Sequence, residues 1–287
     1  MKENGTNSAI KTNNLCHAFG EKKVLQDINL QIDGGEIFGL LGPSGAGKTT
    51  LIKILTGQLK ASAGSVMTLG KNAMELKGMD YRRIGIMMDN FGLYERLSCN
   101  DNLKFFAKLY KLSDTIIPKV LERVGLEQVG KTEVMRLSKG MRSRLQLARA
   151  IMSEPSLLFL DEPTSGLDPA TSERIHQLIL EEKAKGTTIF LTTHNMAEAE
   201  KLCDHIALLN EGHIIESGCP KEICRKYNHQ RKLVLHLQDG KDIVLNHEAS
   251  AAAVITDYLN SDTLETIHST EPNLETVFME LTGRGLQ

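Results

Sequence analysis

Two short segments of this chain combine residue types that bind phosphate and divalent metal ions. The first runs from Gly42 to Thr49 and matches the pattern GxxxxGK[ST]. Its glycines let backbone N–H groups close around phosphate oxygens, and the positive end of a following helix adds to the attraction. Lys48 supplies a charge for the β- and γ-phosphates, and Thr49 offers a hydroxyl to Mg²⁺. The spacing predicts a nucleoside triphosphate site rather than an ordinary glycine turn or a GxGxxG dinucleotide loop.

The second segment places two acids at the end of an apolar run. Residues 157–160 read Leu-Leu-Phe-Leu, and Asp161 and Glu162 follow directly. Ligands of open α/β sheets bind at the carboxyl ends of the strands. Asp161 can hold Mg²⁺, directly or through water, and Glu162 can orient or deprotonate an attacking water. Alone, such a pair could be a surface turn, but after a phosphate loop it predicts the hydrolytic half of the same site.

The segments around these motifs predict an α/β domain with a largely parallel sheet. Apolar runs at 37–41, 157–160 and 188–192 are typical of short buried strands. Strands that alternate with helices favour parallel pairing. The other elements expected in this part are a strand at 24–32, a helix after the phosphate loop, a helical stretch from about 97 to 153, and a hairpin of 206–209 with 214–216.

The two ends of the chain depart from this pattern. Residues 1–13 read as a frayed polar tail. Beyond about Pro220, residues 232–237 and 242–245 flank a turn and predict a second hairpin. A final helix is expected between Pro272 and Gly283. The C-terminal part therefore predicts a small α+β appendage.

Composition excludes several classes of protein. Lys and Arg number 34 against 36 Asp and Glu, Trp is absent and aromatic residues make up 5%, so we expect no nucleic-acid partner. The five cysteines form no CxxC pair, which makes a zinc or disulfide framework improbable and suits a reducing compartment. No apolar run reaches the ~18 residues of a transmembrane helix, and the N-terminus lacks the apolar stretch of a signal peptide.

With its motifs in this order, the chain resembles the ATP-binding subunits of ABC transporters over roughly residues 10–220. Residues 137–141, Leu-Ser-Lys-Gly-Met, are similar to the LSGGQ signature, and residues 165–168 to the D-loop. The resemblance implies a P-loop NTPase (RecA-like) ABC ATPase core with a helical subdomain and a small C-terminal α+β appendage. The implied limits are a polar tail at 1–13, an ATPase domain at 14–226 with its helical subdomain at about 97–153, and an accessory domain at 227–287.

The resemblance also implies roles for individual residues. Phe19 would stack on adenine, and His194 would be the switch histidine that contacts the γ-phosphate. Where the family usually has Gln, this chain has Asp89, which could bind Mg²⁺ but cannot donate a hydrogen bond when ionised. The expected site residues are Glu162 and His194 for catalysis; Phe19, Gly42, Pro43, Ser44, Gly45, Ala46, Gly47, Lys48, Thr49, Thr50, Ser138 and Gly140 for ATP; and Thr49, Asp161 and Asp89 for the metal.

The implied function is ATP binding and hydrolysis that power export through a separate membrane permease. ATP and Mg²⁺ are the expected cofactors. Two such subunits would pair head to tail, as a homodimer or with a second ATPase subunit, peripheral on the cytoplasmic face of the cell membrane. Export is favoured over import because the signature variant and the ending at 271–283 resemble the drug, antibiotic and bacteriocin exporter branch.

Two other functions are compatible with the phosphate loop. The soluble ABC ATPases of translation carry two cassettes in one chain, whereas this chain has one. Those of DNA repair carry a long coiled coil between the phosphate loop and the signature, whereas here only a short segment separates these two motifs. A regulator without turnover is disfavoured because Lys48, Asp161, Glu162 and His194 are all present.

Three further segments have two interpretations each. Cys203 to His205 could suggest metal, but no second ligand pair accompanies them. Residues 90–97 carry the apolar side chains of Phe91, Leu93 and Tyr94, which either receive a permease helix or pack on the helical subdomain. The arginines of the helix after the signature read as a solvated face rather than a nucleic-acid stripe. They are Arg142, Arg144 and Arg149.

Overall fold

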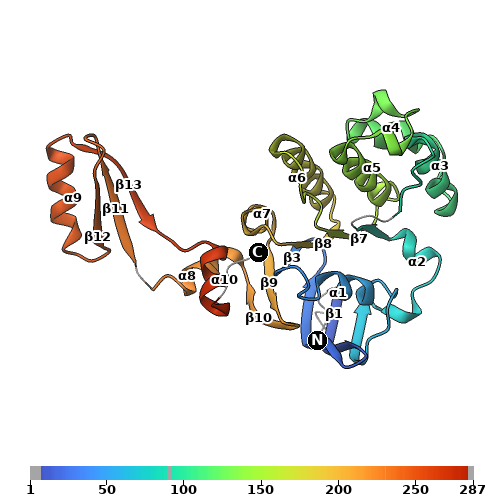
Figure 1. The fold of residues 1–287 in the computed structure, drawn as a ribbon, viewed down its shortest axis with the longest axis horizontal. Coiled ribbons are helices and arrows are strands. Elements are labelled where there is room, and N and C mark those ends of the chain that lie inside the picture. Colours follow the sequence, from blue (N-terminus) through green and yellow to red (C-terminus); the bar gives the residue numbers. More distant parts are fainter. Residues whose placement is uncertain (1–7, 89–91, 230, 284–287) are drawn as a thin grey trace, which may run out of the picture. The chain divides into compact units, whose positions relative to one another are not determined.

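The computed structural model describes residues 8–88, 92–229 and 231–283, which divide into two compact units (Figure 1). The first unit ends at Gly218 and the second begins at Cys219. This division assigns helix α8 (Pro220–Lys226) to the second unit, whereas the sequence analysis placed the limit after residue 226. The functional limits of the two parts stay predictions.

A six-stranded, mostly parallel sheet forms the centre of the first unit, as the sequence predicted. Its strand order is β10-β9-β3-β8-β7-β6, and only the β9–β10 pair is antiparallel. Every residue of the three central strands β3, β8 and β7 is buried, which explains their uninterrupted apolar runs. The strands are β3 (Ile37–Leu41), β6 (Ile84–Met87), β7 (Leu157–Asp161), β8 (Thr188–Thr193), β9 (His205–Asn210) and β10 (His213–Gly218).

A second, four-stranded antiparallel sheet in this unit has the order β2-β1-β4-β5. The expected polar tail to residue 13 is wrong for residues 8–13, because they belong to β1. Ala9, Ile10 and Thr12 are buried, and Thr12 Oγ1 donates to Ile28 O at 2.9 Å. The strands are β1 (Ser8–Phe19), β2 (Lys22–Asp33), β4 (Ala63–Thr68) and β5 (Lys71–Asn72).

Helices cover the parallel sheet and form the expected helical region between β6 and β7. Ser98 caps the first helix of that region, accepting from Asp101 N at 3.1 Å. Buried side chains of α3, α4 and α5 share one core cluster with the sheet, so this region is continuous with the catalytic core. The helices are α1 (Lys48–Leu55), α2 (Met79–Arg82), α3 (Cys99–Leu109), α4 (Ile116–Arg123), α5 (Lys139–Ile151), α6 (Pro169–Ala184) and α7 (Met196–Leu202).

The second unit is built on a three-stranded antiparallel sheet of order β12-β11-β13. The predicted hairpin is β11 (Lys232–Leu237) with β12 (Asp242–Asn246), and the predicted final helix is α10 (Leu274–Thr282), which ends at Gly283 in left-handed conformation. Helix α9 (Ala251–Asn260) and strand β13 (Leu264–Thr270) were not predicted. Six of the seven β13 residues are exposed, so this strand lacks an apolar pattern.

Candidate nucleotide site

The predicted phosphate loop, residues 42–50, joins the end of β3 to α1. Gly45 and Gly47 have φ angles of 82° and 114°, a conformation that favours glycine. A Cβ at Gly47 would also lie only 2.8 Å from Leu25 Cδ2 and 3.0 Å from Val24 O. The loop therefore requires glycine at this position, and it leads directly into the N-terminus of α1, whose dipole favours bound anions.

The Lys48 side chain folds back over this loop. Its Nζ donates to Gly42 O at 2.7 Å and to Pro43 O at 3.2 Å, and lies 3.2 Å from Glu162 Oε1. Lys48 is only 7% exposed, so its ammonium is fixed by these partners rather than by solvent. The sequence prediction that a cation stands within the phosphate loop agrees with this placement.

Asp161 meets the hydroxyl of Thr49 at the edge of the loop. Thr49 Oγ1 donates to Asp161 Oδ2 at 2.8 Å, and Thr192 Oγ1 donates to the other carboxylate oxygen. A hydroxyl and a carboxylate in contact are the hard oxygen ligands that Mg²⁺ prefers, so these residues fit that ion. Thr192 was not predicted, because its contact with Asp161 arises only when β8 pairs with β7.

Glu162 stands between Lys48 and His194. Its Oε2 accepts a hydrogen bond from His194 Nδ1 at 2.7 Å, while Oε1 faces the Lys48 ammonium. His194 follows β8 and is half-exposed, so it reaches Glu162 from the neighbouring strand. The arrangement places a carboxylate, with its two oxygens engaged by different partners, at the mouth of the phosphate loop.

Several of these residues line a cavity of about 400 Å³. Phe19, at the end of β1, lies on its rim with 54% of its surface exposed and packs edge-on against the His17 ring at 4.6 Å. The Phe19 ring is therefore not part of the hydrophobic core, and its role as a base platform stays a prediction. The cavity is lined by Phe19, Lys22, Val24, Ser44, Gly45, Gly47, Lys48, Thr49, Thr50, Asp161 and Glu162.

Several predicted site residues do not line this cavity: the loop residues Gly42, Pro43 and Ala46, the switch residue His194, and the signature residues Ser138 and Gly140. Ser138 caps α5, accepting from Met141 N at 3.2 Å, and Gly140 lies against Thr171 of α6. Neither Ser138 nor Gly140 is among the described residues that line the loop cavity. The predicted metal residue Asp89 lies outside the described residues. The first unit therefore brings together most, but not all, of the expected site.

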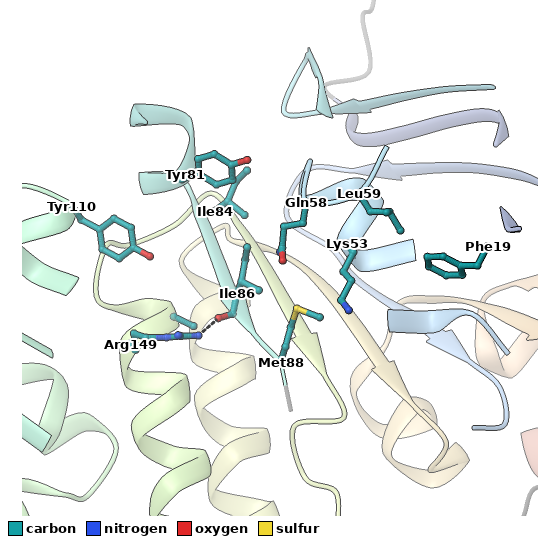
Figure 2. Close-up of a pocket in the computed structure, with 11 residues that line it drawn as sticks. Phe19, Lys53, Gln58, Leu59, Tyr81, Ile84, Ile86, Met88, Tyr110 and Arg149 are labelled. Carbon is teal, nitrogen blue, oxygen red and sulfur yellow. Dashed lines mark hydrogen bonds between the residues drawn. The ribbon is translucent and has the colours of Figure 1, made fainter. Parts of the chain in front are cut away.

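A second cavity, of about 570 Å³, lies beside β6 and shares Phe19 with the phosphate-loop cavity (Figure 2). Arg149 of α5 lies in its wall and donates to Ile86 O at 2.7 Å and to Gly92 O at 2.8 Å. Burial lowers the pKa of this guanidinium, and nearby Tyr110 opposes that shift. The expectation that Arg149 belongs to a solvated face is wrong, because backbone carbonyls take up its donors.

Comparison with known proteins decides the family. The profile of the ABC transporter family matches residues 25–165. The fluoroquinolones export ATP-binding protein of Mycobacterium tuberculosis is 40% identical over 267 residues, which are 91% of this chain and 88% of that protein. This chain belongs to the ABC transporter family. The Nod factor export ATP-binding protein I of Rhizobium johnstonii is 34% identical to this ABC protein over 97% of this chain and 96% of its own.

Solved ABC structures share the fold. The structure of an ATP-binding subunit of an ABC transporter is 30% identical with a TM-score of 0.69, covering 76% of this chain and 93% of that one. A further ATP-binding cassette, in its ADP conformation, is 26% identical with a TM-score of 0.66, over 75% of this chain and 92% of its own.

The expectations for fold and activity are thus confirmed. The chain is an ATP-binding, ATP-hydrolysing subunit of an ABC transporter, with a membrane permease as its implied partner. A soluble ABC ATPase of translation or repair is not favoured. Among the described helices, none combines the length and apolar character needed to cross a bilayer.

Proposed function

We propose that this chain is the motor of an export complex and hydrolyses ATP with Glu162 as the general base. The observation that carries the proposal is the contact of Glu162 with both Lys48 and His194 at the phosphate loop. The relatives are named for export of fluoroquinolones and of Nod factor, which supports export as the direction here. The substitution Glu162→Gln, which removes the base but keeps the shape of the side chain, tests this role through the rate of turnover.

Each residue of the site has a separate task in this proposal. Lys48 neutralises the β- and γ-phosphates, while Phe19 covers the base. Thr49 and Asp161 would hold Mg²⁺, which would neutralise charge on the phosphate oxygens. Glu162 accepts the proton of the attacking water, and His194 fixes the orientation of that carboxylate.

The signature residues imply that one chain cannot complete the site. Ser138 and Gly140 begin α5, which carries no acid in its first turn, so this helix N-terminus favours an anion. We therefore infer a head-to-tail dimer in which they face the γ-phosphate held by the second subunit. A homodimer is the simplest such assembly, and the structure of each site is then identical.

A site divided between subunits makes ATPase activity depend on association. Without permease, the activity per milligram of protein should rise with protein concentration and level off when the dimer is saturated. The measurement is an ATPase assay over a dilution series, with molecular mass followed by light scattering. Constant specific activity from a protein that stays monomeric throughout would contradict the divided site.

We propose that the permease docks at the cavity of Figure 2. Its wall combines apolar side chains of β6, such as Ile84 and Ile86, with Tyr81 and Met88. Lys53 at the same cavity would complement an acidic residue on the incoming segment. The pocket is lined by β6, which pairs with β7, and β7 ends at Asp161, so docking there would act on the strand next to the proposed metal site.

A row of aromatic rings leads from this cavity to the surface of the helical region. Tyr110 packs on Phe106, Phe106 on Phe105, and Phe105 on Tyr94, with ring centroids 5.0–6.4 Å apart. Buried Asn102 fixes Tyr94, because its side chain accepts from Tyr94 N at 2.8 Å and donates to Tyr94 O at 3.0 Å. Tyr94 and Phe105 remain 48% and 44% exposed, as a docking surface requires.

Replacing Tyr94 and Phe105 together by Ser should reduce transport at least about fivefold while basal ATPase stays within about twofold. Neither ring contacts the phosphate loop cavity, so only coupling to the permease should suffer. The measurement compares transport by the complete complex in proteoliposomes with ATPase of the isolated chain. Leu180→Ser, at a 40% exposed apolar residue of α6, is the control. Unchanged transport by the double variant would refute docking at this surface.

We infer that the second unit has an accessory role without chemistry. Every residue proposed to contact ATP lies at or before His194, in the first unit. In the second unit, Leu274, Val277 and Phe278 of α10 are buried, whereas its acids Glu275 and Glu280 are exposed. These acids are consistent with a solvated helix face.

A further inference from the structure

The backbone at Glu162 is left-handed, with a φ angle of 51°. This conformation is unfavourable for a residue with a Cβ and persists only where surrounding contacts hold it. Two backbone hydrogen bonds form the turn: Glu162 N donates to Thr192 O at 3.0 Å, and Ser165 N donates to Glu162 O at 3.2 Å. The direction of the Glu162 carboxylate therefore depends on what fixes residues 162–165.

A buried carboxylate fixes this turn two residues after Glu162. Thr164 Oγ1 donates to Glu198 Oε1 at 2.6 Å, and the same oxygen lies 3.0 Å from His176 Nε2. Glu198 is 2% exposed and is not among the described residues that line the loop cavity. One side chain of α7 thus ties the turn to α6 without reaching the nucleotide site.

The same short element supports Glu162 in two ways. Asn195, the N-cap of α7, accepts from Glu198 N at 3.2 Å, and His194 immediately precedes it. His194 contacts the Glu162 carboxylate directly, while Glu198 holds the turn through Thr164. The junction between β8 and α7 therefore fixes both the side chain and the backbone of the proposed base.

Glu198 is held in its ionised form. Burial raises its pKa, but its interactions with His176, Thr164 and Thr193 together outweigh burial and keep the pKa of Glu198 below its ordinary value. An ionised acceptor binds a hydroxyl more strongly than a neutral one. The Thr164 hydroxyl is thus fixed by a charge-assisted hydrogen bond within a protected environment.

We propose that Glu198 is a positioning residue for ATP hydrolysis, acting through the Thr164 hydroxyl on the strained turn that carries Glu162. The proposal rests on the proposed role of Glu162 as base. Loss of the hydrogen bond lets the turn relax toward ordinary backbone angles, which moves the carboxylate away from the attacking water. Turnover falls, whereas ATP affinity, which comes from the phosphate loop, is kept.

Thr164→Val and Thr164→Ser separate the hydrogen bond from packing. Val keeps the shape of Thr without its hydroxyl, and Ser keeps the hydroxyl without the methyl group. We expect Val to lower kcat about tenfold with KM for ATP within about twofold, and Ser to retain kcat within about twofold. If Thr164 acted only through packing, Ser would lower kcat more than Val does. Val as active as Ser, or both reduced equally, would overturn the proposal.

Glu198→Gln, alone and combined with Thr164→Val, tests whether the two residues act as one unit. The double variant should be no slower than the slower single variant, because both remove the same interaction. If the fold-losses in kcat of the two single variants multiplied in the double variant, the proposal would be overturned. The matched control is Glu182→Gln, since Glu182 is 1% exposed and binds Arg123 Nη2 at 2.6 Å and Lys185 Nζ at 2.8 Å.

The control Glu182→Gln should lower the midpoint temperature of thermal unfolding as much as Glu198→Gln does, while its kcat stays within about twofold of the unmodified protein. An equal loss of kcat in Glu182→Gln would show general destabilisation and sink the positioning role. Glu162→Gln, assayed alongside, separates the two proposals. If Glu162→Gln turns over at the full rate, the base assignment fails. If it is inactive but Thr164→Val is fully active, only the role of Glu198 fails.

Discussion

Glu162→Gln is expected to leave ATP binding intact and to lower turnover by about 10²–10⁴-fold. Glutamine keeps the shape of the side chain and still offers an oxygen to His194 Nδ1, which now lies 2.7 Å from Glu162 Oε2. It cannot accept the proton of an attacking water at neutral pH. ATP-bound dimer should therefore accumulate, visible by size-exclusion chromatography beside the steady-state ATPase rate.

The chain provides a matched control for this substitution. Glu36 Oε2 pairs with His205 Nδ1 at 2.6 Å, which is the same carboxylate–imidazole contact, and Glu36 precedes β3 at the end of the sheet opposite the phosphate loop. Glu36→Gln should keep kcat within about twofold, because it changes the same chemical group away from ATP. A Glu162→Gln protein as active as this control would show that the base is another group.

Lys48→Ala is expected to act on binding instead, weakening ATP affinity by at least about tenfold. The loop carbonyls hold the Lys48 ammonium at 2.7 and 3.2 Å, where it would face the phosphates of bound ATP. The substitution removes this charge. Hydrogen bonds to charged groups are stronger than neutral ones, so the loss is large. Titration with a fluorescent ATP analogue measures the dissociation constant.

Lys60→Ala is the control for Lys48→Ala, because Lys60 is an exposed lysine just beyond α1. It changes the net charge equally and should leave ATP affinity within about twofold. If Lys48→Ala binds ATP as tightly as Lys60→Ala does, the phosphate loop has been assigned to the wrong ligand. The two lysine variants thus separate a specific contact from general electrostatic attraction.

The residues of the proposed catalytic centre could be predicted because they lie in short, contiguous sequence motifs. The phosphate loop and the acids 161–162 each occupy one uninterrupted segment, and the buried parallel strands around them are apolar throughout. Strand β1 was not predicted, because two of its buried positions, Thr12 and His17, carry polar side chains and the segment lacks a regular apolar alternation. Residues 8–13 therefore look like a tail until they pair with β2 and β4.

The supporting contacts were not predictable from spacing. Thr192, Glu198 and Arg149 gain their roles only when β8, α7 and α5 pack around the site. An isolated Glu in a helix, or an Arg among other arginines, is most often exposed to solvent. Tertiary packing reverses that expectation, since it supplies the partners that make a buried charge tolerable.

The central claim is that each ATP site needs the phosphate loop of one subunit and the signature of another. Mixing two inactive variants, Lys48→Ala and Gly140→Asp, tests it most directly. Each pure protein should hydrolyse ATP at less than about a tenth of the normal rate, because every site in it contains one defect. In a mixed dimer one site carries both defects and the other carries none. An equimolar mixture should therefore recover about a quarter of the normal activity. A mixture no more active than its two components, with dimers shown to exchange subunits, would contradict the composite site.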